Sequence, residues 1–450
     1  MTDITPGAFG ASGGSSILRP DARTKKRNAA EKRFRIYGMV AIGIGLFFLV
    51  ALLTTIISRG VPAFQQTFIT LEITLPAETL DKSGNRDPEE MAKVSTFGYN
   101  PLINDAMAAA LEEQGIANPF EDAKDLSQLL SASAAAQVRD RVLANPELVG
   151  TTASFEVLAS SRVDGYLKGR VTRGSVERDK NISPAHLDLV DELRAAGTLH
   201  KSFNWSFITG ADASESRPEQ AGIGVSMLGS LYMMLVVLAL SLPIGVAASI
   251  YLEEFAKQNR LTDIIEVNIS NLAAVPSIVF GILGLAVFIQ FVHLPQSAPL
   301  VGGLVLTLMT LPTIIISTRA ALKAVPPSIR EAALGIGASK TQTVFHHVLP
   351  LAMPGILTGT IIGLAQALGE TAPLLLIGMV GYIASNYPDG FADGFLSPNS
   401  AMPAQIYEWA KRADPAYYER AWGGIIILLL FLMTMNIIAV ILRRRFERRW

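Results

Sequence analysis

Six long apolar runs constrain the fold of this chain more than any other feature of its sequence. Each is long enough, at about 20 residues or more, for a helix to cross the hydrocarbon core of a membrane. They are Tyr37–Ile57, Val225–Ile250, Val267–Val292, Pro299–Ala321, Met353–Val380 and Trp422–Leu442. Half of the 450 residues are hydrophobic and only 17% are charged, which is too apolar for a soluble protein of this size. The sequence therefore predicts an all-α membrane protein with six transmembrane helices.

Basic residues near both ends indicate the orientation of these runs. Lys and Arg are concentrated before the first run and directly after the last one, at Arg443–Arg445. Because Lys and Arg accumulate on the cytoplasmic side of membrane proteins, both termini are expected in the cytoplasm, with no role in nucleic-acid binding. We predict a disordered basic tail at 1–35, a first transmembrane helix at 36–58 and a basic tail at 444–450. Six crossings then leave 253–266 and 325–350 inside, and 293–298 and 382–421 outside.

A polar block of residues, 60–222, separates the first two runs. Acidic residues outnumber basic ones in it, in contrast to the basic ends of the chain, and this fits the outer side of the membrane. Alternating apolar residues predict a strand at 67–75, and helical periodicity appears at 102–111, 126–143 and 186–199. We predict a soluble α+β or mainly helical periplasmic insertion, large enough for a small core of its own.

The sequence contains no arrangement of residues typical of an enzyme. Cysteine is absent, which excludes disulfides and thiolate sites in this chain. His186 and His200 are isolated and are expected to be solvated, and His346-His347 lacks the H-E-x-x-H pattern of a metal site. We therefore expect no enzymatic activity and no cofactor bound by this chain, and we set aside an intramembrane enzyme.

The segment Val325–Pro350 interrupts two apolar runs and has specific local chemistry. Pro326-Pro327 should end the preceding helix. Ser328 with Glu331, and Ser339 with Gln342, have the spacing of capping boxes that open two short helices. Glycines between them predict a corner, and Val344, Phe345 and Val348 should share one face of the second helix before Pro350 closes the unit. The stretch 335–341 lacks the glycine and preceding strand of a P-loop, which excludes nucleotide binding there.

This segment resembles the EAA loop of ABC importer permeases. An ordinary polar helix-turn-helix between spans is the alternative. In that family the loop lies in the cytoplasm and docks on the ATP-hydrolysing subunit, so the resemblance implies a role in coupling. The residues that carry it are Arg330, Glu331, Ala332, Ala333, Gly335, Gly337, Leu349 and Pro350.

Glu370 is the only acidic residue in the fifth run. A charged side chain in the bilayer interior costs about 2.5–3.5 kcal/mol on insertion scales, so it should face a cavity or a partner. The alternative is a hydrated residue near the outer membrane face. Interior prolines interrupt the four runs from the second to the fifth, which favours a bundle that lines a pathway over simple packing kinks. These prolines are Pro243, Pro276, Pro312 and Pro373.

Four segments together resemble the A-type permease subunit of bacterial phosphate ABC importers. They are IYLEEF at 250–255, VPSIVFG at 275–281, LKAVPPSIREAALGIGAS at 322–339 and GETAPLL at 369–375. The resemblance implies a type I ABC importer permease fold in the bacterial inner membrane, with a five-helix core at 224–443. It also implies ATP-driven phosphate import by alternating access, and partners outside this chain. These would be a homodimeric ATP-binding subunit that holds the ATP, a second, C-type permease subunit, a periplasmic phosphate-binding protein and membrane lipid.

The chain departs from this family at two places. The family usually has only a short loop where residues 60–222 stand. Many members carry an arginine four residues before the glutamate, and here the position is Gln366. A pathway role is therefore implied for Glu370 and Thr371, and less directly for Gln366. Arg319 is a candidate substitute for the missing arginine, although it is equally explained as a positive-inside anchor.

Two other functions remain open from the sequence. One is a permease for another oxyanion, such as sulfate or molybdate, which the GETAPLL segment disfavours. The other is a membrane-anchored sensor or receptor that uses the large external domain, for which six spans are more than an anchor needs.

Overall fold

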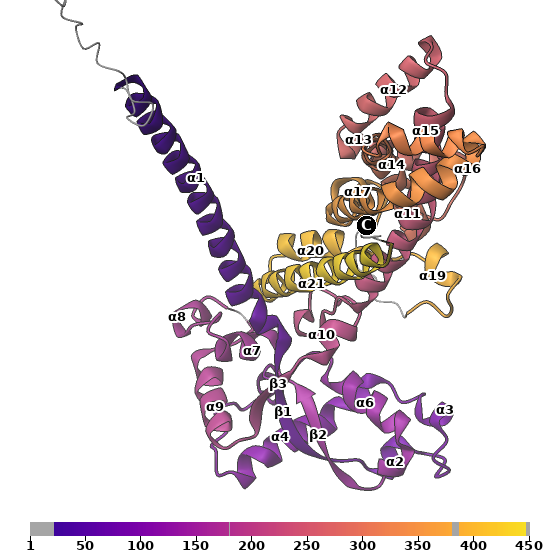
Figure 1. The fold of residues 1–450 in the computed structure, drawn as a ribbon. Helices are drawn as coiled ribbons and strands as arrows, with labels where there is room; N and C mark the ends of the chain where they lie inside the picture. Colours follow the sequence, from indigo (N-terminus) through magenta and orange to yellow (C-terminus); the bar gives the residue numbers. More distant parts are fainter. Residues whose placement is uncertain (1–21, 180, 380–386, 447–450) are drawn as a thin grey trace, which may run out of the picture. The chain divides into compact units, whose positions relative to one another are not determined.

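The computed structural model describes residues 22–179, 181–379 and 387–446. Residues 1–21 of the predicted tail, residues 382–386 of the predicted outer loop and residues 447–450 lie outside this description. Helix α1 (Ala22–Gly60) as far as Ile57 forms one compact unit, and the described chain from Ser58 onward forms another (Figure 1).

Helix α1 is longer than the sequence predicted. It begins at Ala22, so residues 22–35 are helical where a disordered tail was expected. This segment is rich in Ala, Lys, Arg and Glu, which are strong helix formers, and the helix of the apolar run continues through it without a break.

Five helices in the described part of the chain are long and apolar enough to cross a membrane. They are α1, α11 (Gly224–Ile250), α14 (Pro299–Lys323), α17 (Leu349–Gly369) and α21 (Pro415–Phe446). The remaining predicted run, 267–292, is not one straight helix. It is divided between α12 (Arg260–Ala273) and α13 (Ser277–Leu283), which continues as a π-helix over Gly284–Phe291, with a bend of 103° between the two parts.

Pro276 stands at this bend as the residue before α13. A proline has no N–H to donate and disfavours the helical conformation in the residue before it, so the helix ends there. The total is six crossings only if the bent pair makes a single crossing.

The helices α11, α14 and α17 pack side by side and form the centre of the membrane part (Figure 1). Interior prolines stay within the helices at Pro243 of α11, Pro312 of α14 and Pro354 of α17. Two short helices follow α18 (Ala372–Leu376), namely α19 (Asp393–Leu396) and α20 (Met402–Lys411), and α20 packs against α21.

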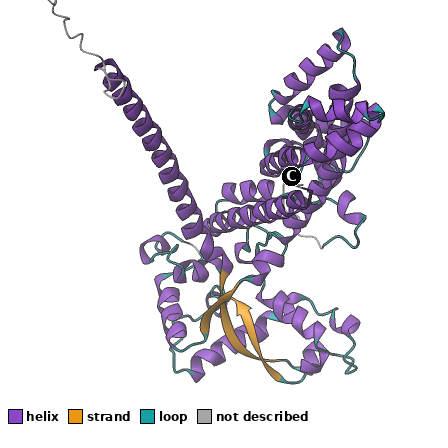
Figure 2. Cartoon of the chain, viewed as in Figure 1, coloured by secondary structure: helices purple, strands orange, loops and turns teal. Residues whose placement is uncertain are grey.

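The insertion is α+β, and one antiparallel sheet in the order β2-β1-β3 lies at its centre (Figure 2). The predicted strand is β1 (Gln65–Thr74), and β2 (Thr152–Leu158) and β3 (Leu199–Phe203) were not predicted. Alternate residues of β1, Ile69, Leu71 and Ile73, point into a hydrophobic core as period-2 alternation requires.

Short helices make up most of the rest of the insertion. They are α2 (Ala77–Leu80), α3 (Pro88–Met91), α4 (Asn100–Glu113), α5 (Ala123–Ser127), α6 (Ala134–Ala144), α7 (Ser161–Leu167), α8 (Arg173–Val176), α9 (Pro184–Ala195) and α10 (Trp205–Thr209). Of these, α4 and α7 pack against β1, α6 against β2 and α9 against β3. The helical periodicity at 126–143 thus belongs to two helices, α5 and α6.

His186 is buried, so the prediction of a solvated residue was wrong. It is 4% exposed, its ring lies 4.1 Å from that of Phe120, and its Nε2 is 3.0 Å from the carbonyl oxygen of Asp125. Burial costs little here because the polar nitrogen has a partner.

Candidate functional site

The first helix of the loop at 325–350 is α15 (Pro327–Gly335), and it begins two residues earlier than a cap at Ser328 would allow. The predicted capping box of Ser328 and Glu331 is therefore wrong. Proline is pre-organised for the first helical position, so Pro327 takes that position and Pro326 becomes the N-cap. The predicted glycine corner is present, because Gly337 has φ +92° and the Ala338 N–H donates to the carbonyl oxygen of Ala333.

The second predicted capping box is confirmed at Ser339. Its hydroxyl accepts from the Gln342 N–H at 3.2 Å, and the Gln342 side-chain oxygen accepts from the Ser339 N–H at 2.9 Å. This cap opens α16 (Lys340–Thr343), which passes through a π-helical turn at Val344–Val348 directly into α17.

Two details of the second helix were predicted incorrectly. Pro350 does not close the unit but is the second residue of α17, directly after the π-helical turn. Val344 and Val348 are buried as expected, whereas Phe345 is 49% exposed, because consecutive residues lie about 100° apart around a helix.

Arg330 fastens this loop to the membrane helices. Its guanidinium pairs with Glu254 at 2.7 Å and donates to the carbonyl oxygens of Val325 (2.7 Å) and Leu322 (2.9 Å) at the end of α14. Glu254 lies in a π-helical turn, Tyr251–Phe255, that ends α11, and its side chain is only 8% exposed. Two of the segments that carry the family resemblance are thus joined by a buried ion pair.

Arg319 belongs to the same cluster of charges. It pairs with Glu253 at 3.3 Å and with Glu266 of α12 at 2.7 Å, so its charge is neutralised near the end of α14. Within the described residues it makes no hydrogen bond or ion pair with Gln366 or Glu370, and its two ion pairs favour the anchor role over a pathway role. The two glutamates could have been suspected from the sequence, because Glu253 follows one apolar run and Glu266 directly precedes the next, on the side that carries the arginines.

The opposite face of the loop is exposed and partly apolar. Ile336 is 84% exposed and Leu334 is 50% exposed, and both lie beside the exposed residues Glu331 and Ala332. No side chain among the described residues pairs with the Glu331 carboxylate. Ala333 points inward and is 4% exposed. We call the unit from Pro326 to Val348 the knob. Its stem is held by the Arg330–Glu254 ion pair and by the helix caps, and its tip, with Leu334 and Ile336, is exposed and free to bind another surface.

Glu370 lies where the fifth span breaks. Helix α17 ends at Gly369, Glu370 is extended with φ −76° and ψ 130°, and α18 begins at Ala372. The break packs closely against α13. Gly281 of α13 lies so near to it that a Cβ atom added to this glycine would stand 2.7 Å from the Cα of Pro373. Another pair of resemblance segments, VPSIVFG and GETAPLL, is therefore in direct contact.

On one side of this break, side chains are left uncovered by the rest of the described chain. Gln366 is exposed and shares a stripe of α17 with the exposed residues Ile362 and Gly369, and Glu370 and Thr371 are half-buried next to it. In the described part of the chain no ion pair or side-chain hydrogen bond holds the Glu370 carboxylate. An ionisable group of this kind within an apolar span indicates a cavity or a partner subunit on that side.

Replacing Arg330 with methionine is expected to destabilise the knob strongly. It would leave the largely buried Glu254 carboxylate without a cation. Removing one partner of a fully buried pair costs about 3–5 kcal/mol, and the 23% exposure of Arg330 places the expected cost at or below the lower end of that range. Thermal unfolding of the purified protein should show a clear fall in melting temperature. Lys323→Met is the control, because the Lys323 side chain is 60% exposed and its ion pair with Glu253 is long, at 3.6 Å. Equal stability of the two variants would contradict a structural role for the Arg330–Glu254 pair.

Comparison with known proteins agrees with this geometry. Residues 241–450 match the family model "Binding-protein-dependent transport system inner membrane component", and residues 21–177 match "Domain of unknown function (DUF3333)". The phosphate transport system permease protein PstA 1 of Mycobacterium tuberculosis (strain CDC 1551 / Oshkosh) is 33% identical over 234 residues, 52% of this chain and 74% of that protein.

Two further relatives cover a similar share of the chain. PstA of Pasteurella multocida is 30% identical over 49% of this chain and 76% of its own length. The probable ABC transporter permease protein YqgI of Bacillus subtilis is 30% identical over 48% and 76%, respectively. A solved methionine ABC transporter in an inward-facing conformation is 16% identical, with a TM-score of 0.38, over 50% of this chain and 95% of that chain. The chain belongs to the binding-protein-dependent transport system inner membrane components and, within them, to the PstA-type permeases.

Proposed function

We propose that this chain is a transmembrane permease subunit of an ATP-driven inorganic phosphate importer. Family membership and the names of the relatives support the substrate class. The observation that carries the mechanism is the knob, whose stem is bonded to α11 and α14 while its tip offers Leu334 and Ile336 to another protein.

The knob suits the transmission of force from a separate ATPase. Packed elements with fixed contacts transmit displacement, whereas a floppy loop would absorb it. The homodimeric ATP-binding subunit binds and hydrolyses ATP, and its closure displaces the knob together with α11, α14 and α17. This chain itself is not an enzyme and holds no ATP.

The pathway is formed with a second permease subunit. Glu370, Thr371 and Gln366 line this chain's side of it, and the uncovered stripe of α17 faces the second, C-type subunit across it. Arg319 anchors the bundle near the knob. A periplasmic phosphate-binding protein delivers the substrate, both termini lie in the cytoplasm, and the insertion lies outside the bacterial inner membrane.

Uptake into proteoliposomes tests this function. The chain would be co-purified with its ATPase and second permease and supplied with binding protein, ATP and radiolabelled phosphate. We expect saturable, ATP-dependent phosphate uptake that excess unlabelled sulfate or molybdate does not reduce. Uptake of sulfate or molybdate in place of phosphate would establish the other oxyanion function. Failure of any ATPase to co-purify would favour the sensor.

A further inference from the structure

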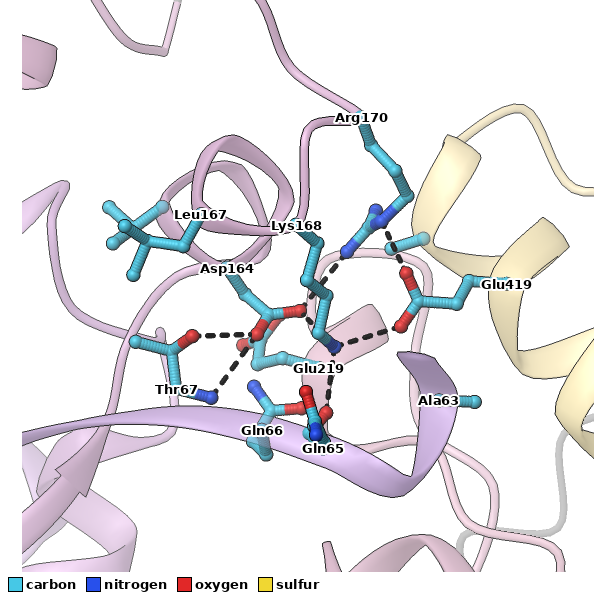
Figure 3. A network of polar contacts seen from close by, with 12 residues as sticks. Ala63, Gln65, Gln66, Thr67, Asp164, Leu167, Lys168, Arg170, Glu219 and Glu419 are labelled. Atoms are coloured by element: carbon cyan, nitrogen blue, oxygen red, sulfur yellow. Dashed lines mark hydrogen bonds and ion pairs between the residues drawn. The ribbon is translucent and has the colours of Figure 1, made fainter. Parts of the chain in front are cut away.

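Buried charges join the insertion to the last transmembrane helix. Lys168, at the end of α7, lies 2.7 Å from Asp164 and 2.8 Å from Glu419 in α21, and Arg170 pairs with both of these carboxylates (Figure 3). The side chains of Lys168, Asp164 and Glu419 are at most 5% exposed. These two segments are about 250 residues apart in the sequence.

The same cluster is bonded to the central strand of the insertion. Asp164 accepts hydrogen bonds from the N–H of Thr67 at 3.1 Å and from its hydroxyl at 2.8 Å, and Lys168 donates to the carbonyl oxygen of Gln65 at 2.7 Å (Figure 3). The ion pairs to Glu419 are therefore fixed to β1 and its sheet, not to a surface loop.

Arg420 makes a second link beside the first. It is 2% exposed and donates to the carbonyl oxygen of Ala63 (2.9 Å), the side-chain oxygen of Gln66 (2.6 Å) and the carbonyl oxygen of Glu219 (3.0 Å). Ala63 lies where the chain enters the insertion and Glu219 where it leaves, so one guanidinium holds both ends of the insertion against α21.

Two outer ion pairs and a shared apolar core complete the junction. Arg162 of α7 pairs with Asp414 at 2.6 Å, and Asp212 pairs with Arg412 at 2.6 Å. Asp212 also accepts from the indole N–H of Trp409 in α20 at 2.7 Å. Ala63, Phe207, Ala221, Trp409 and Tyr417 are buried in one hydrophobic cluster.

Such a junction resists opening. Opening it would break these hydrogen bonds and ion pairs together and would expose the shared apolar cluster to water, which is unfavourable. Domains of one chain move relative to one another unless the interface between them is large and hydrophobic, and here the apolar cluster runs across the junction. From these contacts we infer that the insertion (residues 60–222) and the pair α20–α21 move as one rigid body throughout the transport cycle, with Glu419 and Arg420 as the positioning residues. The transport cycle in this statement rests on the proposed function.

Distance measurements between spin labels test this inference. Because the chain has no cysteine, labels attach to it only at introduced sites. One label would be placed at Glu192→Cys on α9 and the other at Ala413→Cys, two exposed positions on opposite sides of the junction. The complete transporter, with cysteine-free partner subunits, would be measured without nucleotide, with ATP and after trapping with vanadate.

We expect the 192–413 distance to be narrowly distributed and to shift by less than about 2 Å among all three states, the scale that separates rigid association from rearrangement. A comparison pair, Ile336→Cys with Ala413→Cys, reports on the knob and should shift by more. A broad 192–413 distribution in the resting state, or a shift as large as that of the comparison pair, overturns the inference. The result does not depend on the transported substrate, so it stands apart from failure of phosphate uptake.

Charge balance provides a second test of the network. Lys168→Met leaves the buried cluster with one excess negative charge, and Glu419→Gln leaves it with one excess positive charge. The double variant retains the balanced pair of Asp164 and Arg170. We expect either single change to broaden the 192–413 distribution and the double change to broaden it less. Broadening by the double variant equal to the two single effects combined would overturn the role of the network. If a single variant does not assemble, the 192–413 distances measured with Lys168 and Glu419 unchanged decide whether the inference holds.

Discussion

Replacing Gly337 with aspartate is expected to reduce ATP-dependent uptake by about 5- to 150-fold, the range that corresponds to a coupling free energy of 1–3 kcal/mol. Gly337 has φ +92°, a conformation that costs an L-residue about 1–2 kcal/mol, and it forms the corner that sets the angle between α15 and α16. The change should reorient Ile336 at the tip of the knob. ATP hydrolysis by the assembled complex should continue, since the altered residue is not in the ATPase.

Gly115→Asp is the matched control. Gly115 follows helix α4 with φ +68°, and it has open space around it as Gly337 does. Both variants therefore place an L-residue at a positive φ and add the same new charge, but only one lies on the knob. Wild-type uptake by Gly337→Asp, or equal loss in the two variants, would show that the corner is not needed for coupling.

Glu370→Gln is expected to reduce uptake by roughly 30-fold or more, since loss of a desolvated charged contact costs about 2 kcal/mol or more. The substitution preserves the shape of the side chain and removes its charge. Assembly should be unchanged, because no ion pair within the described residues depends on this carboxylate. The measurement combines initial uptake rates with the amount of intact complex recovered.

The control for this substitution is Glu112→Gln, which makes the same chemical change at an exposed site on α4. It should transport at the wild-type rate. If Glu370→Gln also transports normally, Glu370 is a hydrated bystander near the outer face. If the complex is lost instead, its carboxylate serves contact with the second permease and not the pathway.

The predictable parts of this protein are those determined by local sequence. Helices α11 and α14 lie within two residues of the apolar runs that predicted them, because burial in lipid depends on an uninterrupted run of apolar residues. The glycine corner at Gly337 and the cap at Ser339 followed from preferences of single residues. Pro276 was recognised as an interruption, but the angle of 103° at that point depends on what the two helices pack against.

Contacts between distant segments were not predictable in the same way. Arg330 was singled out as part of the loop, yet its partner Glu254 stands 76 positions earlier, and nothing in the spacing assigns one to the other. The link between Glu419 and Lys168 joins residues that are 251 positions apart in the sequence. Charged residues that flank an apolar run are usually explained as anchors at the membrane surface. For this reason the charges before the last run did not indicate a contact with the insertion.

The two π-helical turns at Tyr251–Phe255 and Val344–Val348 have a mechanical consequence. A π-helical turn is wider than an α-helical one, and such turns are points where helices kink. One turn ends α11 beside the knob's ion pair, and the other connects the knob to α17. Under the proposed coupling, a displacement of the knob would bend α11 and α17 at these turns, while the part of the knob held by the Arg330–Glu254 pair moves as one piece.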